Sequence, residues 1–345
     1  MGRSCVLWFS LLFGITSLAQ AQSPTEWRGS SPSEQVLDAA AFKGVGETIS
    51  EHMGDVQSVV VVLRGRTVFE FYRDGAPATL RDVHSVAKSA LSALVGVAVG
   101  QGRIASLDQP VLALMPEWTA LNPDPRAATI TVRHLLTMSA GFEVNDPTGT
   151  AAAGRPQDTW ARPLRSAPGA AFAYDNALIP MLSAVLERAT GMPLADYARE
   201  QLVTPLMFAE PAYSRGLGLR TLDMAKLGQL FLQNGVWGGK QIVPQDYVMA
   251  ATHPQNAGGP PVSLSYGYMW WVVPSSAARP TFMASGFGGQ FIWVYPPLDL
   301  VIAATSTASP ETSRRGQALQ LIRGRLFTAA QRRLAGEPGV SVRVP

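Results

Sequence analysis

The stretch SVAKSALSALVGVAVGQG, residues 85–102, joins a polar pair to a long apolar segment. Ser85 and Lys88 stand three residues apart, so on a helix they share one face and the amine reaches the hydroxyl. A serine at the start of a helix also lies near free backbone N–H groups, which favour developing negative charge. The residues that follow are apolar nearly all round, which predicts a buried helix over residues 90–101 that ends at Gly102.

The Ser–Lys spacing has a chemical and a structural interpretation. A serine beside a lysine is a known form of activated nucleophile, in which the lysine takes the hydroxyl proton. The amine must be neutral for this, so burial or a nearby cation has to lower its pKa. Alternatively, Ser85 caps the helix and Lys88 is a solvated residue of its first turn. A lysine has the wrong charge for a helix start, and the apolar sequence after it favours burial.

A second motif, Tyr174-Asp175-Asn176, precedes a helical pattern over residues 177–190. A tyrosine phenol beside a lysine can relay protons to a leaving group, and an asparagine amide can hold a substrate carbonyl. The structural alternative is that Asp175 or Asn176 caps the following helix. The two roles can coexist.

The remaining sequence runs from strands to helices, back to strands and then to a last helix. After a short helix near residues 44–53, two β-type runs flank Arg64-Gly65-Arg66, which predicts a hairpin of residues 57–63 and 67–72. Helical periodicity marks residues 131–138, 177–190, 193–201 and 222–234. Further β-type runs lie at residues 266–273, 281–284, 290–295 and 300–305, followed by a helix over 309–335. Strands from both ends of a chain most simply pair into one antiparallel sheet.

This order predicts an α+β fold, an antiparallel sheet flanked by N- and C-terminal helices with a mostly helical inserted domain. We assign residues 36–88 and 256–335 to the sheet domain and residues 89–255 to the helical domain. Residues 22–35 are expected to be a flexible lead-in and residues 336–345 a tail. A cleft between the two domains is where ligand sites tend to lie.

The N-terminus has the parts of a secretory signal peptide, residues 1–21. Arg3 supplies a positive charge, residues 6–18 are apolar but too short to cross a membrane, and Ala19-Gln20-Ala21 is a small-x-small cleavage site. The alternative, an N-terminal core helix, would lack a polar face. We therefore expect a periplasmic or secreted protein.

The composition excludes several classes of partner and cofactor. Hydrophobic residues make up 47% of the 345 residues, and the net charge is only +3, with no basic cluster of the kind that binds nucleic acid. No apolar run reaches the length of about 20 residues that spans a bilayer, so we expect no stable membrane insertion after signal cleavage. Cys5 is the only cysteine, and the four histidines show no metal-ligand spacing. No metal and no organic cofactor are expected.

The paired motifs Ser85-x-x-Lys88 and Tyr174-x-Asn176 resemble those of the serine β-lactamase and penicillin-recognising hydrolase superfamily. The resemblance is to its class C-like branch, which includes D-alanyl-D-alanine carboxypeptidases, family VIII esterases and aminohexanoate-dimer hydrolases. It covers about residues 40–330, with softer support from TVRHLLT at 131–137, SAG at 139–141 and GFGGQ at 286–290. It implies a β-lactamase/transpeptidase-like fold in which Ser85 is acylated while Lys88 and Tyr174 share proton transfer. Asn176 would orient the substrate.

The sequence departs from this family at its third motif, a K-T-G or H-x-G on a strand beside the nucleophile. The corresponding strand reads FMASG at residues 282–286, with no lysine or histidine. The family's cation helps bind a substrate carboxylate and lower nearby pKa values, so its absence favours an esterase or amide hydrolase over a β-lactamase or peptidase. Ser285 replaces the family's threonine as a substrate contact or is a plain strand residue. Gly286 and Phe287 are expected to contact substrate, and the strand backbone after Gly286 is expected to supply the second oxyanion donor, at a residue that the sequence does not fix.

Other polar and aromatic residues have weaker claims to the chemistry. His84 is next to Ser85, but adjacent helix residues point apart, so packing or hydrogen bonding is the expected role. Trp270-Trp271 either line the cleft or belong to the core. Arg133 and His134 are expected to brace a helix. The absence of a G-x-S-x-G elbow argues against an α/β-hydrolase.

Two functions follow from different classes of protein. The first is an exported serine hydrolase that acts on a small-molecule or peptide-like ester or amide through an acyl-Ser85 intermediate. The second is a non-catalytic relative that binds peptidoglycan-like or protein ligands in the same cleft. The complete set Ser85, Lys88 and Tyr174 favours the enzyme, because a binding module does not need three proton-transfer groups in register.

Overall fold

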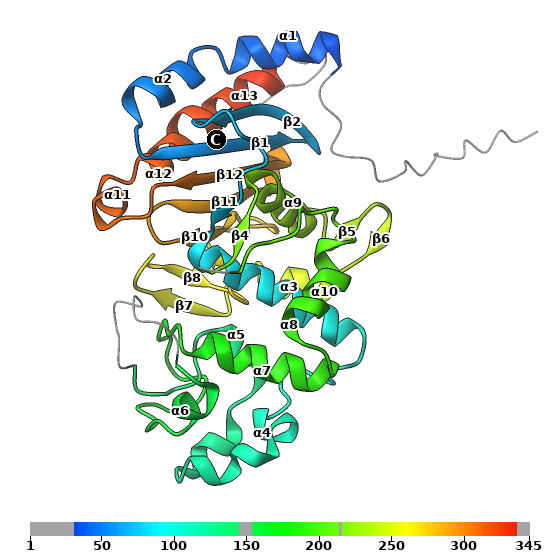
Figure 1. The fold of residues 1–345 in the computed structure, drawn as a ribbon, viewed down its shortest axis with the longest axis vertical. Helices are drawn as coiled ribbons and strands as arrows, with labels where there is room; N and C mark the ends of the chain where they lie inside the picture. Colours follow the sequence, from blue (N-terminus) through cyan, green and yellow to red (C-terminus); the bar gives the residue numbers. More distant parts are fainter. Residues whose placement is uncertain (1–30, 145–153, 214–215, 337–345) are drawn as a thin grey trace, which may run out of the picture.

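The computed structural model describes residues 31–144, 154–213 and 216–336. In these ranges the chain forms an eight-stranded sheet in which every neighbouring pair is antiparallel (Figure 1). In sheet order the strands are β2 (Arg66–Tyr72), β1 (Val56–Leu63), β12 (Leu300–Ser306), β11 (Gln290–Tyr295), β10 (Phe282–Gly286), β9 (Trp271–Val272), β8 (Leu264–Tyr266) and β7 (Asn256–Gly259). Two ribbons lie apart from it, β3 (Arg81–Asp82) with β4 (Gly218–Leu219), and β5 (Val236–Trp237) with β6 (Lys240–Gln241).

Strands from the first and the last part of the described chain pair in this sheet, as the sequence predicts. Strand β1 pairs with β12, with Val59 opposite Ala304, and with β2 through a turn at Arg64 and Gly65, both at positive φ. Two successive residues at positive φ give the turn whose twist matches a two-residue hairpin. Every residue of β12 is buried, so both faces of the sheet are covered.

The α-helices of the described residues either cover a face of the sheet or pack with one another away from it (Figure 1). They are α1 (Pro32–Ala41), α2 (Val45–His52), α3 (Ala87–Gly100), α4 (Val111–Leu114), α5 (Val132–Leu136), α6 (Pro156–Trp160), α7 (Leu178–Thr190), α8 (Leu194–Ala198), α9 (Thr221–Leu232), α10 (Gln245–Ala251), α11 (Pro310–Arg315), α12 (Gln317–Leu321) and α13 (Phe327–Ala335). Helices α1, α2 and α13 lie together over β1 and β2 (Figure 1). Tyr295 of β11 packs edge-on against Phe327 of α13, with ring centroids 4.9 Å apart. Side chains alternate along a strand, so Ile292 and Val294 point to the opposite face, where they meet α9.

Helix α9 falls inside residues 89–255, the range predicted as a helical domain, yet it packs on the sheet. Its Gly228 makes the close approach possible, because a Cβ there would lie 2.6 Å from Ile292 and 2.7 Å from Val301. Helix α3 is buried along most of its length, which confirms the buried helix predicted from its apolar sequence. The predicted α+β class and the antiparallel sheet are likewise confirmed.

Three expectations about segment ends differ from the structure. Helix α1 starts at Pro32, inside the stretch predicted as a lead-in, because Ser31 and Glu34 form a capping box. The single strand predicted for residues 266–273 is divided into β8 and β9 by a turn with Met269 at φ 58°. The last predicted helix is broken at Gly316, whose φ is 61°. The predicted signal peptide, residues 1–21, and residues 337–345 of the predicted tail lie outside the described residues.

Within the described ranges, no helix combines the length and the apolar character needed to cross a membrane.

Candidate active site

Ser85 lies on a one-turn 3₁₀ helix, His84–Val86, which leads directly into α3. This turn touches the end of β10. A Cβ on Gly286 would come within 2.5 Å of the Val83 carbonyl oxygen, so only a glycine permits the contact. The predicted nucleophile is thus placed where the sheet meets the inserted helices.

Lys88 is turned toward Ser85, as the spacing predicts. Its Nζ lies 2.8 Å from Ser85 Oγ, and the residue is only 7% exposed. Burial lowers the pKa of the Lys88 amine to about 7. The alternative in which Lys88 is a solvated first-turn residue is therefore wrong. An amine with this pKa is neutral in a substantial fraction of molecules near neutral pH, as a proton acceptor requires.

Tyr174 forms the third member of this group. Lys88 Nζ lies 5.0 Å from the centre of the Tyr174 ring, and the ring stacks on Trp271 at 5.9 Å between centroids. Burial raises the pKa of the Tyr174 phenol to about 12, although a hydrogen bond with Ser85 lowers it in part. The phenol is thus a protonated donor at neutral pH, placed beside both groups. Of the tryptophan pair, Trp271 lines the cavity while Trp270 is fully buried and packs on Phe231.

The two interpretations of Tyr174-Asp175-Asn176 apply to different residues. The Asp175 carboxylate accepts a hydrogen bond of 2.9 Å from the Ala177 N–H at the start of α7, and it pairs with Arg162. Asn176 lines the same cavity as Ser85. Asp175 therefore has the capping role, and Asn176 is part of the cavity wall.

Ser285, Gly286 and Phe287 line the cavity on the sheet side. Ser285 is opposite Phe291 in the β10–β11 pair, and the strand ends at Gly286. Phe287 is 42% exposed, although it is a large apolar side chain. The structure thus brings all seven predicted site residues to one cavity.

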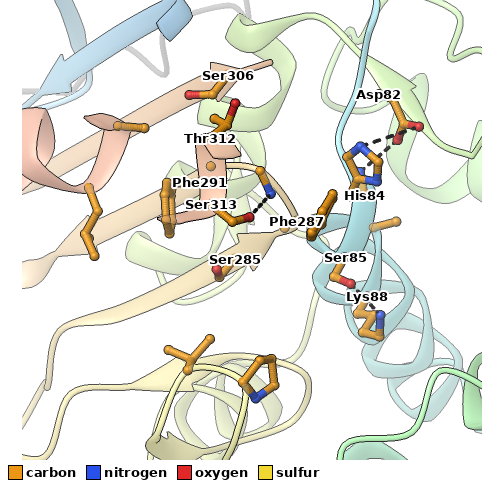
Figure 2. A pocket seen from close by; sticks show the side chains of 18 of the residues that line it. Asp82, His84, Ser85, Lys88, Ser285, Phe287, Phe291, Ser306, Thr312 and Ser313 are labelled. Atoms are coloured by element: carbon orange, nitrogen blue, oxygen red, sulfur yellow. Dashed lines mark hydrogen bonds and ion pairs between the residues drawn. The ribbon is translucent and has the colours of Figure 1, made fainter. Parts of the chain in front are cut away.

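The cavity is larger than the motifs alone indicate, with a volume of about 1150 Å³. Figure 2 shows Phe287 between the Ser85–Lys88 pair on one side and Phe291 with Ser313 on the other. Beyond Phe287 the cavity has a second part, which we term the far lobe. It is lined by Phe291, Ser306, Pro310, Thr312, Ser313, Gly316, Gln317, Ala318 and Leu319. Sequence reasoning missed this lobe. Its residues from Pro310 to Leu319 come from a helix predicted as a plain continuous element, and Phe291 and Ser306 come from strands β11 and β12.

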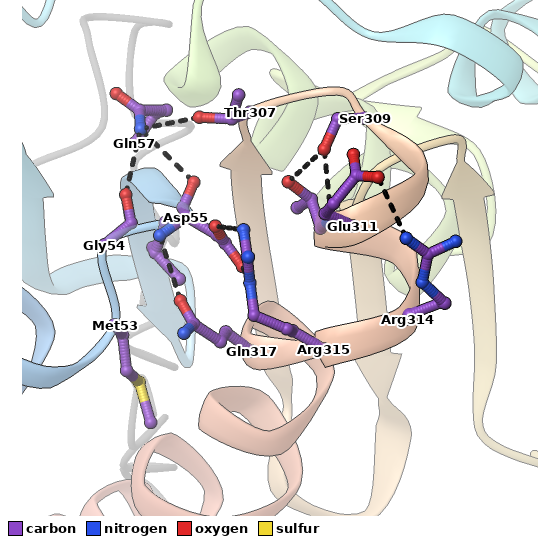
Figure 3. A network of polar contacts seen from close by, with 12 residues as sticks. Met53, Gly54, Asp55, Gln57, Thr307, Ser309, Glu311, Arg314, Arg315 and Gln317 are labelled. Carbon is purple, nitrogen blue, oxygen red and sulfur yellow. Dashed lines mark hydrogen bonds and ion pairs between the residues drawn. The ribbon is translucent and has the colours of Figure 1, made fainter.

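The wall of the far lobe is attached to β1 by polar contacts (Figure 3). Gln317 Oε1 accepts a hydrogen bond of 2.9 Å from the Asp55 N–H, and the Asp55 carboxylate pairs with Arg315. The break at Gly316 lets Arg315 and Gln317 both turn toward Asp55. Helices α11 and α12 are therefore held as a fixed wall.

The acidic and basic side chains that line the described part of the cavity are those of Asp82, His84 and Lys88. The His84 ring places Nε2 3.9 Å from Asp82 Oδ2 and packs edge-on against Phe287, with centroids 5.9 Å apart. These contacts agree with the packing and hydrogen-bonding role predicted for His84. Sequence reasoning missed Asp82, whose signal is the Asp-x-His spacing before the nucleophile.

Arg133 and His134 are absent from the cavity lining. Arg133 pairs with Asp108 at 2.6 Å and donates to the Tyr268 hydroxyl. His134 Nδ1 accepts a hydrogen bond of 3.2 Å from the Thr131 N–H at the start of α5. Both contacts hold α5 in place, as expected. Among the described residues, no three His, Cys, Asp or Glu side chains converge as metal ligands would.

Comparison with known proteins identifies the family. The model of the Beta-lactamase family matches residues 45–218. The 6-aminohexanoate-dimer hydrolase of Paenarthrobacter ureafaciens is 27% identical over 338 residues, covering 84% of this chain and 83% of that protein. Esterase EstB of Burkholderia gladioli is 32% identical over 146 residues, 37% of each chain. The solved structure of EstCE1, a hydrolase with promiscuous acyltransferase activity, superposes with a TM-score of 0.68 at 17% identity, covering 86% of this chain and all of that one.

The fold and the site thus define a β-lactamase/transpeptidase-like serine hydrolase. The chain belongs to the Beta-lactamase family, and its homologues include an esterase and an amide hydrolase. The resemblance drawn from Ser85-x-x-Lys88 and Tyr174-x-Asn176 is confirmed at the level of the family.

Proposed function

We propose that this protein hydrolyses carboxylic esters or amides through an acyl intermediate on Ser85. The observation that carries this proposal is the 2.8 Å contact between Lys88 Nζ and Ser85 Oγ in a buried setting that brings the pKa of the amine to about 7. A buried lysine beside a serine has no structural advantage, because desolvating an ammonium group costs free energy. Proton transfer explains the arrangement.

In the first half of the reaction, neutral Lys88 accepts the Ser85 proton while Oγ forms a bond to the carbonyl carbon of the substrate. The negative charge that develops on the carbonyl oxygen lies near the backbone N–H groups of Ser85 and Phe287, which we assign as the oxyanion donors. Tyr174 donates its proton to the departing alcohol or amine and regains one from Lys88. The Asn176 amide orients the carbonyl side of the substrate.

In the second half, water replaces the leaving group. The phenol–amine pair removes a proton from the water as its oxygen attacks the acyl carbon, and the proton returns to Ser85 Oγ when the acyl bond breaks. The acid product is released and the free enzyme is restored. Tyr174 is therefore needed in both halves.

The charges in the cavity favour a neutral substrate. Lys88 is buried against Ser85, and the other basic side chain that lines the described cavity, that of His84, faces Asp82. Neither is positioned as a separate anchor for a substrate carboxylate. The far lobe adds the apolar side chains of Phe291 and Leu319. We therefore propose uncharged esters or amides with an apolar chain, in keeping with the esterase and the amide hydrolase among the homologues.

Covalent labelling tests the nucleophile. The purified protein is incubated with an alkyl fluorophosphonate, and its intact mass is measured beside Ser85→Ala and Ser89→Ala. Ser89 is the matched control, since it is a buried serine of the same segment whose hydroxyl donates to the Met269 carbonyl. One adduct on the wild type and on Ser89→Ala, with none on Ser85→Ala, is the expected result. An adduct on Ser85→Ala would overturn the assignment.

Ester chain length tests the substrate class. Leu319→Trp fills the far lobe, whereas Gln320→Trp places the same side chain on an exposed neighbouring position. We expect Leu319→Trp to lower kcat/KM for p-nitrophenyl octanoate at least tenfold more than for p-nitrophenyl acetate. Gln320→Trp should leave kcat/KM unchanged for both esters. An equal effect on both esters would contradict the proposed use of the lobe.

We also propose that the protein is exported, on the basis of the charged start, apolar run and small-x-small site in residues 1–21. N-terminal sequencing of the protein from the periplasm or medium, with Gln22 as the expected first residue, tests this.

A further inference from the structure

The backbone directly before the nucleophile has an unusual conformation. His84 has φ 47°, in the left-handed region that residues with a Cβ rarely adopt. Val83 before it is right-handed, with φ −95° and ψ −1°. The backbone therefore changes from right-handed to left-handed at His84, which is the first residue of the 3₁₀ turn that carries Ser85. The direction of the Ser85 side chain depends on this reversal.

Asp82 holds this conformation in place. Its Oδ1 accepts a hydrogen bond of 2.8 Å from the His84 N–H, two residues on, which closes an Asx turn. The second oxygen of the carboxylate faces the His84 ring, with Oδ2 3.9 Å from Nε2. One side chain thus contacts both the backbone and the ring of the strained residue.

Asp82 is itself fixed by its surroundings. It belongs to β3 and is opposite Gly218 of β4, and the next N–H, that of Val83, donates to the Leu217 carbonyl at 2.9 Å. A Cβ on Gly216 would lie 3.2 Å from Asp82 Oδ1, so the residues just before β4 lie close to the carboxylate. The Asx turn therefore rests on a ribbon anchored outside α3.

From this geometry we propose that Asp82 is a positioning residue for the reaction. Its carboxylate clamps His84 in the left-handed conformation, and this aims Ser85 Oγ at Lys88 and at the substrate. The inference rests on Ser85 being the nucleophile. Asp82 touches no reacting atom, so it acts through the backbone of His84. The imidazole is not required as an acid or base.

The strain at His84 supplies a specific test. Glycine adopts positive φ at no steric cost, whereas a β-branched residue resists it. Asp82→Asn keeps an oxygen acceptor for the His84 N–H, while Asp82→Ala removes it. If the clamp matters, Asp82→Ala is harmful only while residue 84 carries a side chain. Glycine at position 84 then rescues Asp82→Ala.

The experiment measures the second-order rate of fluorophosphonate labelling by intact mass for the whole chain. We expect Asp82→Asn to stay within about threefold of the wild type and Asp82→Ala to label about tenfold more slowly, since a left-handed residue is disfavoured by an amount of that order. Asp82→Ala/His84→Gly should label at close to the rate of His84→Gly alone. His84→Val should label as slowly as Asp82→Ala. The pH midpoint of labelling should stay the same in all variants, because Lys88 keeps its surroundings.

The proposal is overturned if Asp82→Ala labels at the wild-type rate, if Asp82→Asn is as slow as Asp82→Ala, or if His84→Gly gives no rescue. Urea unfolding of the wild type, Asp82→Ala, His84→Gly and the double variant forms a double-mutant cycle of stability, which needs no measurement of activity. If the losses in free energy of unfolding of the two single variants add up to that of the double variant, Asp82 does not hold His84 in place, and the proposal is overturned. Absence of label on the wild type would overturn the acyl-serine function instead, and the unfolding cycle would still decide on the clamp.

Discussion

Replacing Lys88 by methionine should abolish acylation and at the same time stabilise the protein. Lys88 is 7% exposed, and burial lowers the pKa of its amine from 10.5 to about 7. Protonated Lys88 therefore destabilises the folded protein. Methionine fills a similar volume with an apolar chain and has no charge to desolvate.

The size of the effect follows from the two pKa values. The pKa of Lys88 falls from 10.5 in the unfolded chain to about 7 in the folded protein, and at 1.36 kcal/mol per pH unit this corresponds to about 5 kcal/mol. Because the folded pKa is the lower one, the unfolded chain binds more protons between these values, so stability rises with pH there. Below pH 7 the burial of Lys88 destabilises the folded protein by this full amount, and above pH 10.5 the destabilisation vanishes. At pH 9 about 2 kcal/mol of it remains.

Urea unfolding of the wild type and Lys88→Met at pH 6 and pH 9 measures this difference. Subtracting the two proteins cancels the titration of all other groups. We expect the stability advantage of Lys88→Met to shrink by about 3 kcal/mol from pH 6 to pH 9, whatever the constant contribution of packing and of the lost Ser85 contact. Parallel pH dependences for the two proteins would show that Lys88 titrates normally, and would refute its role as a neutral base.

Three other changes have outcomes that the structure fixes. Tyr174→Phe removes the phenol proton beside Lys88 and should lower turnover about 10²–10⁴-fold with little change in melting temperature. Treated with a p-nitrophenyl ester, whose leaving group needs no proton, the variant should retain the acyl group in its intact mass. Unchanged turnover would exclude Tyr174. Gly286→Ala places a Cβ 2.5 Å from the Val83 carbonyl oxygen, so fluorophosphonate labelling of Ser85 should slow at least tenfold. If this variant labels at the wild-type rate, β10 does not support the turn that carries Ser85. Gly228→Ala overpacks α9 against the sheet and should cost about 1–3 kcal/mol in urea unfolding; an unchanged midpoint would contradict the close approach of α9.

The fold could be predicted to the extent that each element carries its own pattern. The hairpin of β1 and β2 and the buried α3 have period and composition that only one secondary structure satisfies. The turn at Met269 leaves no such trace, because tertiary contacts decide it. The break at Gly316 has only the weak signal of a lone glycine inside a helical pattern. Arg315 and Gln317 both bind Asp55, which is far from them in sequence, so the residues around them do not predict these contacts.

The candidate site was predictable where its residues are close in sequence. Ser85 and Lys88 share a helix face, so their contact follows from spacing alone. Tyr174 required the family motif, since nothing local ties residue 174 to residue 88. The far lobe was not predictable, because Phe291 and Leu319 look like ordinary core residues until their elements are placed. Asp82 lies between these cases: the Asx turn is local, but its importance depends on the left-handed His84.

The burial of Lys88 in the apolar helix α3 explains why this chain can lack the cation of the third motif. In the family this cation serves two purposes, lowering the pKa of the proton-transfer groups and binding a substrate carboxylate. Here burial alone brings the pKa of Lys88 to about 7, so the first purpose is met without it. Only the second is lost with the FMASG strand, and a substrate without a carboxylate does not need it. The apolar helix that buries Lys88 therefore permits both an active Ser85 and a preference for neutral esters or amides.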